Sequence, residues 1–164
     1  METRLALPIH PVPPAMRSDG RVLRIEGLVV QPLILDQELL AALPRITLEE
    51  PFTCEEGWSV PGLHWSGVRL DDILRHSQPL PSARYVRVAA ESYVLPLPLA
   101  DAELAVLCDE LNGQPLEVQH GAPWRLVVPG AAYYASVKWV ERLLVAADPG
   151  DNTAQSIARG RLRG

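Results

Sequence analysis

The segment TCEEGW contains a potentially reactive cysteine, Cys54, which is followed by two acids, a glycine and a tryptophan. A thiol in such a place packs as a small apolar group, forms half of a disulfide, or binds a metal as a thiolate. The chain has one other cysteine, Cys108, and nothing in the sequence marks secretion, so reduced thiols are favoured over a disulfide. The apolar and the metal-binding alternatives for Cys54 both stay open at this point.

The segment HGAPWR contains two further side chains that could bind a ligand, His120 and Arg125. Gly121 and Pro123 between them suit a tight bend that would bring both side chains to one place. The arginine fork can donate two parallel hydrogen bonds to a phosphate. The ordinary alternatives are a histidine satisfied by backbone atoms in a turn and an arginine in a surface ion pair.

A third segment, SVKW, contains Ser136 and Lys138. The apolar pattern of SVKWVERLLVAA predicts a strand, in which these two residues take alternate positions. Alternate side chains of a strand point to one face, so we expect Ser136 and Lys138 to lie together, with Val137 and Trp139 on the other face. The alternative is the solvent-facing side of an edge strand.

The strands that must position these residues are short. Branched apolar residues, alternation and bounding prolines or glycines predict five of them, at 21–30 with a break at Gly27, 45–52, 83–90, 124–130 and 136–147. The strand at 45–52 would deliver Cys54 at its end, and strand ends are where rigid scaffolds place chemistry.

Three short helices are expected between the strands. Asp36 is placed to cap a helix that Pro44 stops, and residues 67–77 carry leucines and an isoleucine at helical spacing. In residues 101–113 the same spacing puts Cys108 on a buried helical face, with Asn112 and Gly113 at the helix terminus. Cys108 is therefore expected in the core.

The length of 164 residues suits one domain with a real core. The fold class we expect is α+β, a single domain with a mixed β-sheet and short helices. Residues 1–20 read as an extended N-terminal arm, 21–148 as the domain, and 149–164 as a polar C-terminal tail that forms a solvated, disordered end.

Charge and hydropathy exclude two classes of partner. The net charge of −5 argues against nucleic acid, because binding phosphate backbones requires a cationic field. No window approaches the roughly 20 apolar residues of a membrane span. The N-terminus, METRLALPIHPVPP, has no long apolar core and no small-residue cleavage site, so we expect a cytoplasmic protein.

Taken in order, these segments resemble the molybdopterin-binding domain of the sulfite oxidase family. The resemblance rests on TCEEGW followed by HWSGVRL, on LNGQPLEVQHGAPWRLVVPG and on SVKW, and it runs from about Arg24 to Val145. The family includes sulfite oxidases, plant-type nitrate reductases and a bacterial methionine-sulfoxide reductase. The segment around Cys54 looks closest to the bacterial reductase. The resemblance implies the fold of the sulfite-oxidase middle domain and molybdopterin, the molybdenum cofactor.

The resemblance also implies roles for five residues. Cys54 matches the cysteine that is the one protein ligand of molybdenum, which metal coordination would deprotonate. His120 and Arg125 match the residues that hold the pterin and its phosphate. Ser136 and Lys138 match positions at the phosphate end, where lysine acts as a point charge.

Two departures from the family pattern bear on function. Residues 133–135 are Tyr-Tyr-Ala where relatives carry a glycine and a basic residue, so one phosphate-binding cation is absent there. Glu55 and Glu56 replace the arginine cluster that follows the cysteine in sulfite oxidases. Acids at that place would repel sulfite or nitrate, which favours a small neutral substrate.

Three functional hypotheses follow. The first is a molybdopterin-dependent oxidoreductase that performs oxygen-atom transfer or reduction on a small-molecule substrate, with a separate electron-transfer partner, because the sequence has no haem or flavin motif. The second is a non-enzymatic binding module or complex subunit that keeps the fold and has weakened or lost cofactor binding. The third is a hydrolase with Cys54 as nucleophile and His64 or His120 as base, which lacks an oxyanion-loop signature.

Overall fold

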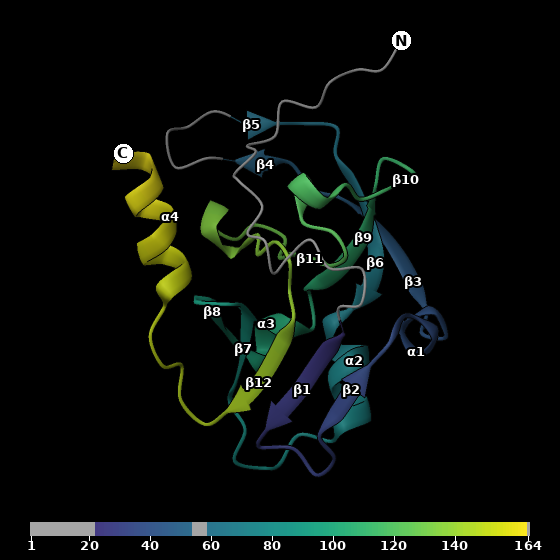
Figure 1. Ribbon diagram of the computed structural model, residues 1–164, viewed down its shortest axis with the longest axis vertical. Coiled ribbons are helices and arrows are strands. Elements are labelled where there is room, and N and C mark those ends of the chain that lie inside the picture. The colour runs from purple at the N-terminus through teal and green to yellow at the C-terminus, as the bar shows by residue number, and fades with distance from the viewer. Residues whose placement is uncertain (1–21, 54–58, 164) are drawn as a thin grey trace.

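Two five-stranded sheets form the body of the protein in the computed structural model, which describes residues 22–53 and 59–163 (Figure 1). Cys54, Glu55 and Glu56 lie outside the described residues, as does the expected N-terminal arm. The helices within the described ranges are all too short or too polar to cross a membrane.

The first sheet is mixed, as expected. Strands β1 and β12 run parallel, with Ile25 opposite Leu143, and the other neighbours pair antiparallel. Gly27 ends β1 with a φ of +97°, where a Cβ would lie 2.3 Å from the carbonyl oxygen of Val145. The predicted break at Gly27 is therefore confirmed. The order across the sheet is β2 (Leu33–Leu35), β1 (Leu23–Gly27), β12 (Arg142–Ala146), β7 (Tyr85–Ala90) and β8 (Tyr93–Pro98).

The second sheet carries the segments that approach the site. Strand β9 lies at its centre and pairs with β6 on one side and with β10 and β11 on the other. Its strands are β10 (Gln114–Pro115), β9 (Val106–Leu111), β6 (His64–Arg69), β3 (Arg45–Glu49) and β11 (Arg125–Val127). Strands β4 (Phe52–Thr53) and β5 (Ser59–Val60) form a separate antiparallel pair. The strand expected at 45–52 is thus two strands, β3 and β4.

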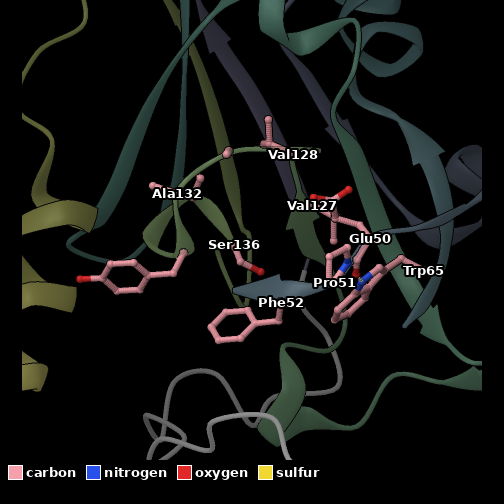
Figure 2. Close-up of a pocket in the computed structure, with 11 residues that line it drawn as sticks. Glu50, Pro51, Phe52, Trp65, Val127, Val128, Ala132 and Ser136 are labelled. Carbon is pink, nitrogen blue, oxygen red and sulfur yellow. Dashed lines mark hydrogen bonds between the residues drawn. The ribbon is translucent and has the colours of Figure 1, made fainter. Parts of the chain in front are cut away.

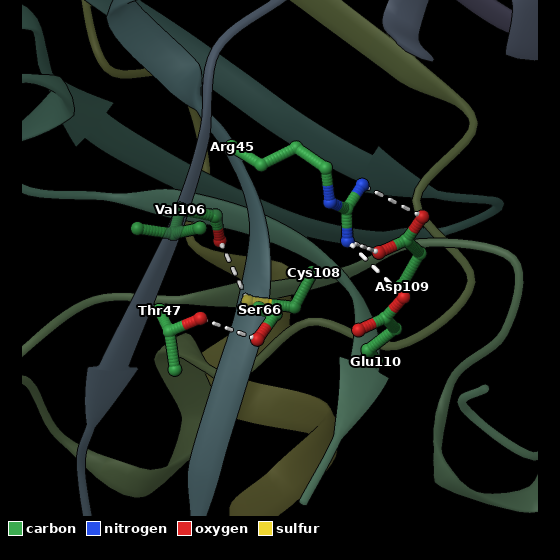
Figure 3. Close-up of polar contacts among 7 residues, drawn as sticks. All are labelled: Arg45, Thr47, Ser66, Val106, Cys108, Asp109 and Glu110. Carbon is green, nitrogen blue, oxygen red and sulfur yellow. Dashed lines mark hydrogen bonds and ion pairs between the residues drawn. The ribbon is translucent and has the colours of Figure 1, made fainter. Parts of the chain in front are cut away.

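Polar side chains tie β3, at the edge of this sheet, to β6 and to β9 beyond it (Figure 3). Nη2 of Arg45 donates to Asp109 across 2.6 Å, and the hydroxyls of Thr47 and Ser66 lie 2.8 Å apart. The next residue, Gly67, follows a register shift, and a Cβ there would lie 2.0 Å from the carbonyl oxygen of Leu107. Close approach of β6 and β9 therefore requires the glycine of HWSGVRL.

Two of the expected helices are confirmed. Helix α1 (Gln37–Ala41) is capped by Asp36, whose Oδ1 accepts from the backbone N–H of Leu39 across 2.9 Å. Helix α2 (Leu70–Ser77) buries its apolar face in the larger core, which also takes residues from the first sheet and from one face of the second. A smaller apolar cluster around Trp65 and Cys108 lies on the other face of the second sheet.

The helix expected over 101–113 is wrong. Helix α3 (Leu99–Ala102) is short, and Cys108 lies in β9, fully buried and with a free thiol. Leu107 faces the larger core and Cys108 the smaller cluster, so β9 is apolar on both faces and shows no period of two. Asn112 and Gly113, with φ of +52° and +78°, form a two-residue hairpin turn rather than a helix terminus.

Two further expectations differ from the structure. The segment 136–139 is irregular and follows a short 3₁₀ helix, η3 (Tyr133–Ala135). The strand that was expected to begin at 136 is β12, which begins only at Arg142. The polar segment after 149 forms helix α4 (Thr153–Arg163) instead of a disordered end. Its buried positions are Ala154 and Ala158, and alanines do not produce the apolar pattern by which a packed helix is recognised in a sequence.

Candidate functional site

Arg125 is the centre of the site. It begins β11, and its side chain is only 2% exposed. Nε donates to the hydroxyl of Ser136 across 2.8 Å, and Nη1 donates to the carbonyl oxygen of His120 across 3.0 Å. The guanidinium carbon lies 4.8 Å from the centroid of the Trp65 ring. One arginine side chain thus contacts β6, the turn at His120 and the segment after η3.

The charge of Arg125 has no carboxylate partner among the described residues. Burial lowers the pKa of its guanidinium to about 10, so the group stays protonated at neutral pH. A buried charge without a counter-ion is costly, by several kcal/mol as an order of magnitude. An anionic ligand would relieve that cost.

His120 ends the 3₁₀ helix η2 (Val118–His120) and is 7% exposed. Its Nδ1 is buried and has no hydrogen-bond partner among the residues that the structure describes. Burial, with the nearby charges of Lys138 and Arg125, lowers the pKa of the imidazole, which is therefore neutral at pH 7. An unsatisfied buried nitrogen costs about 1–3 kcal/mol, so this atom marks a place where a ligand could form a hydrogen bond.

Lys138 lies beside the histidine turn. Its Nζ donates to the carbonyl oxygen of Gln119 across 2.9 Å. Burial, followed by the charges of Arg125 and Arg161, lowers the pKa of its ammonium group to about 7. Gly121, at φ of +118°, permits this packing, because a Cβ there would lie 3.2 Å from the Cα of Lys138. Side chains larger than glycine would push the two segments apart.

The structure therefore brings together four of the five residues singled out from the sequence: His120, Arg125, Ser136 and Lys138. They meet although Ser136 and Lys138 lie in an irregular segment and not at alternate positions of a strand. The fifth residue, Cys54, lies outside the described residues.

A small pocket is lined in part by Ser136 and Trp65 (Figure 2), two residues that contact Arg125. Its cavity volume is about 40 Å³, and Ser136, which accepts from Arg125, forms part of its wall. Glu50 contributes a carboxylate whose Oε1 accepts from the backbone N–H of Gly130 across 2.8 Å. The remaining lining residues are mostly apolar or aromatic: Pro51, Phe52, Trp65, Val127, Val128, Ala131, Ala132, Tyr133 and Ala135. The chain reaches this pocket at Phe52, two residues before Cys54.

Sequence reasoning missed two residues next to this site. The hydroxyl of Tyr93 donates to the carbonyl oxygen of Tyr134 across 2.7 Å, and burial raises the pKa of this phenol to about 12. The guanidinium carbon of Arg161 lies 5.7 Å from the centroid of the Tyr93 ring. The sequence gives no clear signal for Arg161, because the positions that pack its helix are the alanines Ala154 and Ala158.

Comparison with known proteins gives one family and several relatives. The family model described as oxidoreductase molybdopterin binding domain matches residues 9–154. The uncharacterized oxidoreductase YuiH of Bacillus subtilis is 37% identical over 121 residues, which cover 72% of this chain and 61% of that protein. The NADPH nitrate reductase of Aspergillus niger is 31% identical over 157 residues, covering 78% of this chain and 18% of that protein.

A solved structure shares the fold. The sulfane dehydrogenase SoxCD of Paracoccus pantotrophus matches with a TM-score of 0.74 and 27% identity, over 79% of this chain and 39% of that chain. The expected fold, a single α+β domain of the sulfite oxidase type, is confirmed by this match. The chain spans about three fifths of YuiH and less than a fifth of the nitrate reductase.

Proposed function

This chain belongs to the family of oxidoreductase molybdopterin-binding domains, whose cofactor is molybdopterin, and we propose that it catalyses oxygen-atom transfer or reduction on a small neutral substrate. The observation that carries the proposal is the buried, protonated Arg125 without a carboxylate partner among the described residues. A phosphate such as that of molybdopterin supplies the missing negative charge.

The residues at the site fit this cofactor. Arg125 and Lys138 would hold the phosphate, since both are cationic or readily protonated and both lie beside the same turn. His120 would accept a pterin N–H, or donate to a pterin acceptor in its other tautomer, through its Nδ1, which has no partner in the described ranges 22–53 and 59–163. Ser136 would orient the guanidinium by accepting from Nε of Arg125.

Cys54 would bind molybdenum as a thiolate. Its support is the family resemblance of the TCEEGW segment and the position of Phe52, two residues earlier in the chain, in the wall of the pocket. When bound, the cofactor supplies two-electron chemistry at molybdenum, with transfer of an oxygen atom to or from the substrate. The protein holds the cofactor, limits the size of what enters and sets the local charge.

The pocket favours a small substrate without negative charge. Glu50 places a carboxylate in its wall, and Glu55 and Glu56 follow the cysteine in the sequence. Like charges repel, so sulfite and nitrate would bind poorly in this pocket. Electrons would come from a separate partner protein, and we place the reaction in the cytoplasm.

A comparison of substrates tests this function. Protein produced with molybdate in a host that makes the cofactor should reduce a neutral sulfoxide or N-oxide with a reduced viologen dye as electron donor, and should do so faster than it reduces nitrate. Faster turnover of nitrate, or rapid oxidation of sulfite, would contradict the proposed substrate class. A folded protein that binds phosphate and carries no cofactor would favour the alternative of a non-enzymatic binding module.

A further inference from the structure

Helix α4 lies almost wholly beyond the part of the chain that the family model matches, which ends at residue 154. Its first turn is capped by one side chain and fixed to β8 by another. Asn152 accepts from the backbone N–H of Gln155 across 3.0 Å, and Thr153 accepts from the backbone N–H of Val94 in β8 across 2.8 Å. In Figure 1 the helix, drawn in yellow, runs along one side of the molecule toward the end that carries β4 and β5.

One face of α4 packs against the protein. Ala154 and Ala158 are buried, and Arg161 follows at the i+7 position, so its side chain projects from the same face. The helix contacts β8 and η3, the two elements that hold Tyr93 and Tyr134. The packed alanines therefore aim Arg161 at these elements.

A continuous set of contacts leads from Arg161 to the centre of the site. The Arg161 guanidinium lies 5.7 Å from the Tyr93 ring, and the Tyr93 hydroxyl donates to the carbonyl oxygen of Tyr134. Two residues later Ser136 accepts from Nε of Arg125. Burial and the charge of Arg125, and then the charge of Arg161, lower the pKa of Lys138, which agrees with this set of contacts. The side chain of Arg161 is exposed, so a ligand could reach it.

We propose that Arg161 is a third cation of the anion site, adding its charge to those of Arg125 and Lys138 where the phosphate of the cofactor binds. The three residues before Ser136 are Tyr133, Tyr134 and Ala135, none of which is cationic, so α4 would supply a charge that this segment lacks. This inference rests on the proposed function, since the anion it serves is the cofactor's phosphate.

The test compares three variants with the native chain. Arg161→Gln removes the charge. Arg161→Lys keeps the charge and removes the planar guanidinium group. Arg159→Gln is the matched control, because residue 159 lies about 200° around the helix from residue 161. Thermal unfolding confirms that each variant is folded before binding is measured.

The first measurement is the pKa of Lys138 in the cofactor-free protein, followed by NMR of labelled lysine side chains. Arg161→Gln should raise this pKa because a repelling cation is removed, while Arg159→Gln should leave it nearly unchanged. Arg161→Lys, which keeps the charge, should also leave this pKa nearly unchanged, and this result separates a role of the charge from a role in packing. Equal pKa values in the native protein and Arg161→Gln would overturn the inference.

The second measurement is the affinity for inorganic phosphate at low salt, by calorimetry. Arg161→Gln should weaken binding about fivefold, and Arg161→Lys and Arg159→Gln by less than about twofold. If Arg125→Gln abolishes binding and Arg161→Gln does not change it, the inference is wrong and the proposed function stands. If Arg161→Lys loses as much affinity as Arg161→Gln, the charge is not what matters and the inference also fails. If the native protein binds neither phosphate nor pterin, the proposed function fails, and the inference with it.

Discussion

The carbonyl oxygen of His120 accepts a hydrogen bond from Nη1 of Arg125 across 3.0 Å, so the residue that ends η2 is held by the residue that begins β11. The same guanidinium is buried and lacks a carboxylate partner in the described parts of the chain. One side chain thus fixes the shape of the turn and supplies the positive charge that an anionic cofactor needs.

Replacing this arginine separates binding from folding. Arg125→Met should lower the pterin content of purified protein by at least about tenfold, because the charge-assisted bonds to phosphate are lost. Its unfolding temperature should change by only a few degrees, since an apolar side chain of similar length removes an uncompensated buried charge. Pterin is measured by fluorescence after oxidation. Arg45→Met, which alters an arginine of the β3 edge, is the control and should keep its pterin.

Lys138 should make the stability of the cofactor-free protein depend on pH. Its pKa is about 7 in the folded protein against an ordinary 10.5, because of burial and the charges of Arg125 and Arg161. Between these values the unfolded chain binds one more proton than the folded protein, so the free energy of unfolding should rise from pH 7 to about pH 10. Urea unfolding across this range tests the effect. Lys138→Met should show a clearly smaller rise, and an identical slope in both proteins would contradict the assignment.

Gly121 should tolerate no side chain. Gly121→Ala places a Cβ 3.1 Å from the Cβ of Arg125 at a φ of +118°, so we expect a loss of about 1–3 kcal/mol in unfolding free energy and weaker pterin retention. Gly160→Ala is the matched control, since its Cβ would meet nothing within 4 Å in α4, and it should stabilise by up to about 1 kcal/mol. Equal effects of the two substitutions in denaturant unfolding would count against the close packing at Gly121.

Cys54→Ser should remove the bond between the protein and molybdenum without removing the pterin. If the thiolate binds molybdenum, the variant keeps its fold and its pterin and loses the thiolate-to-metal absorption band in the visible spectrum, together with activity. Cys108→Ala should keep that band, because Cys108 is buried in β9 away from solvent and burial raises the pKa of its thiol to about 12. A Cys54→Ser spectrum that matches the native one would exclude the ligand role.

Local pattern was sufficient for parts of the fold. Helix α2 is predictable because its apolar residues recur at helical spacing, and strand β7 because Val86 and Val88 alternate with Tyr85 and Arg87. Strand β9 was misread as a helix because both of its faces are buried, which removes the period of two. Helix α4 was missed because its buried positions are alanines.

The candidate site was likewise predictable only in part from the sequence. His120 and Arg125 are five residues apart, and Gly121 and Pro123 between them indicate a bend. Their proximity was therefore predictable. The position of Arg161 depends on packing against Tyr93, a contact between distant parts of the chain that no local pattern contains. Long-range packing also decides that Ser136 and Lys138 reach Arg125 from an irregular segment.

Because we propose that Arg125, Lys138 and His120 hold molybdopterin, the native protein should contain the cofactor when it is purified from a cofactor-producing host supplied with molybdate. The measurement is the amount of molybdenum and of pterin per chain in this protein. About one of each is expected. A correctly folded protein with far less than one pterin per chain would contradict this proposal.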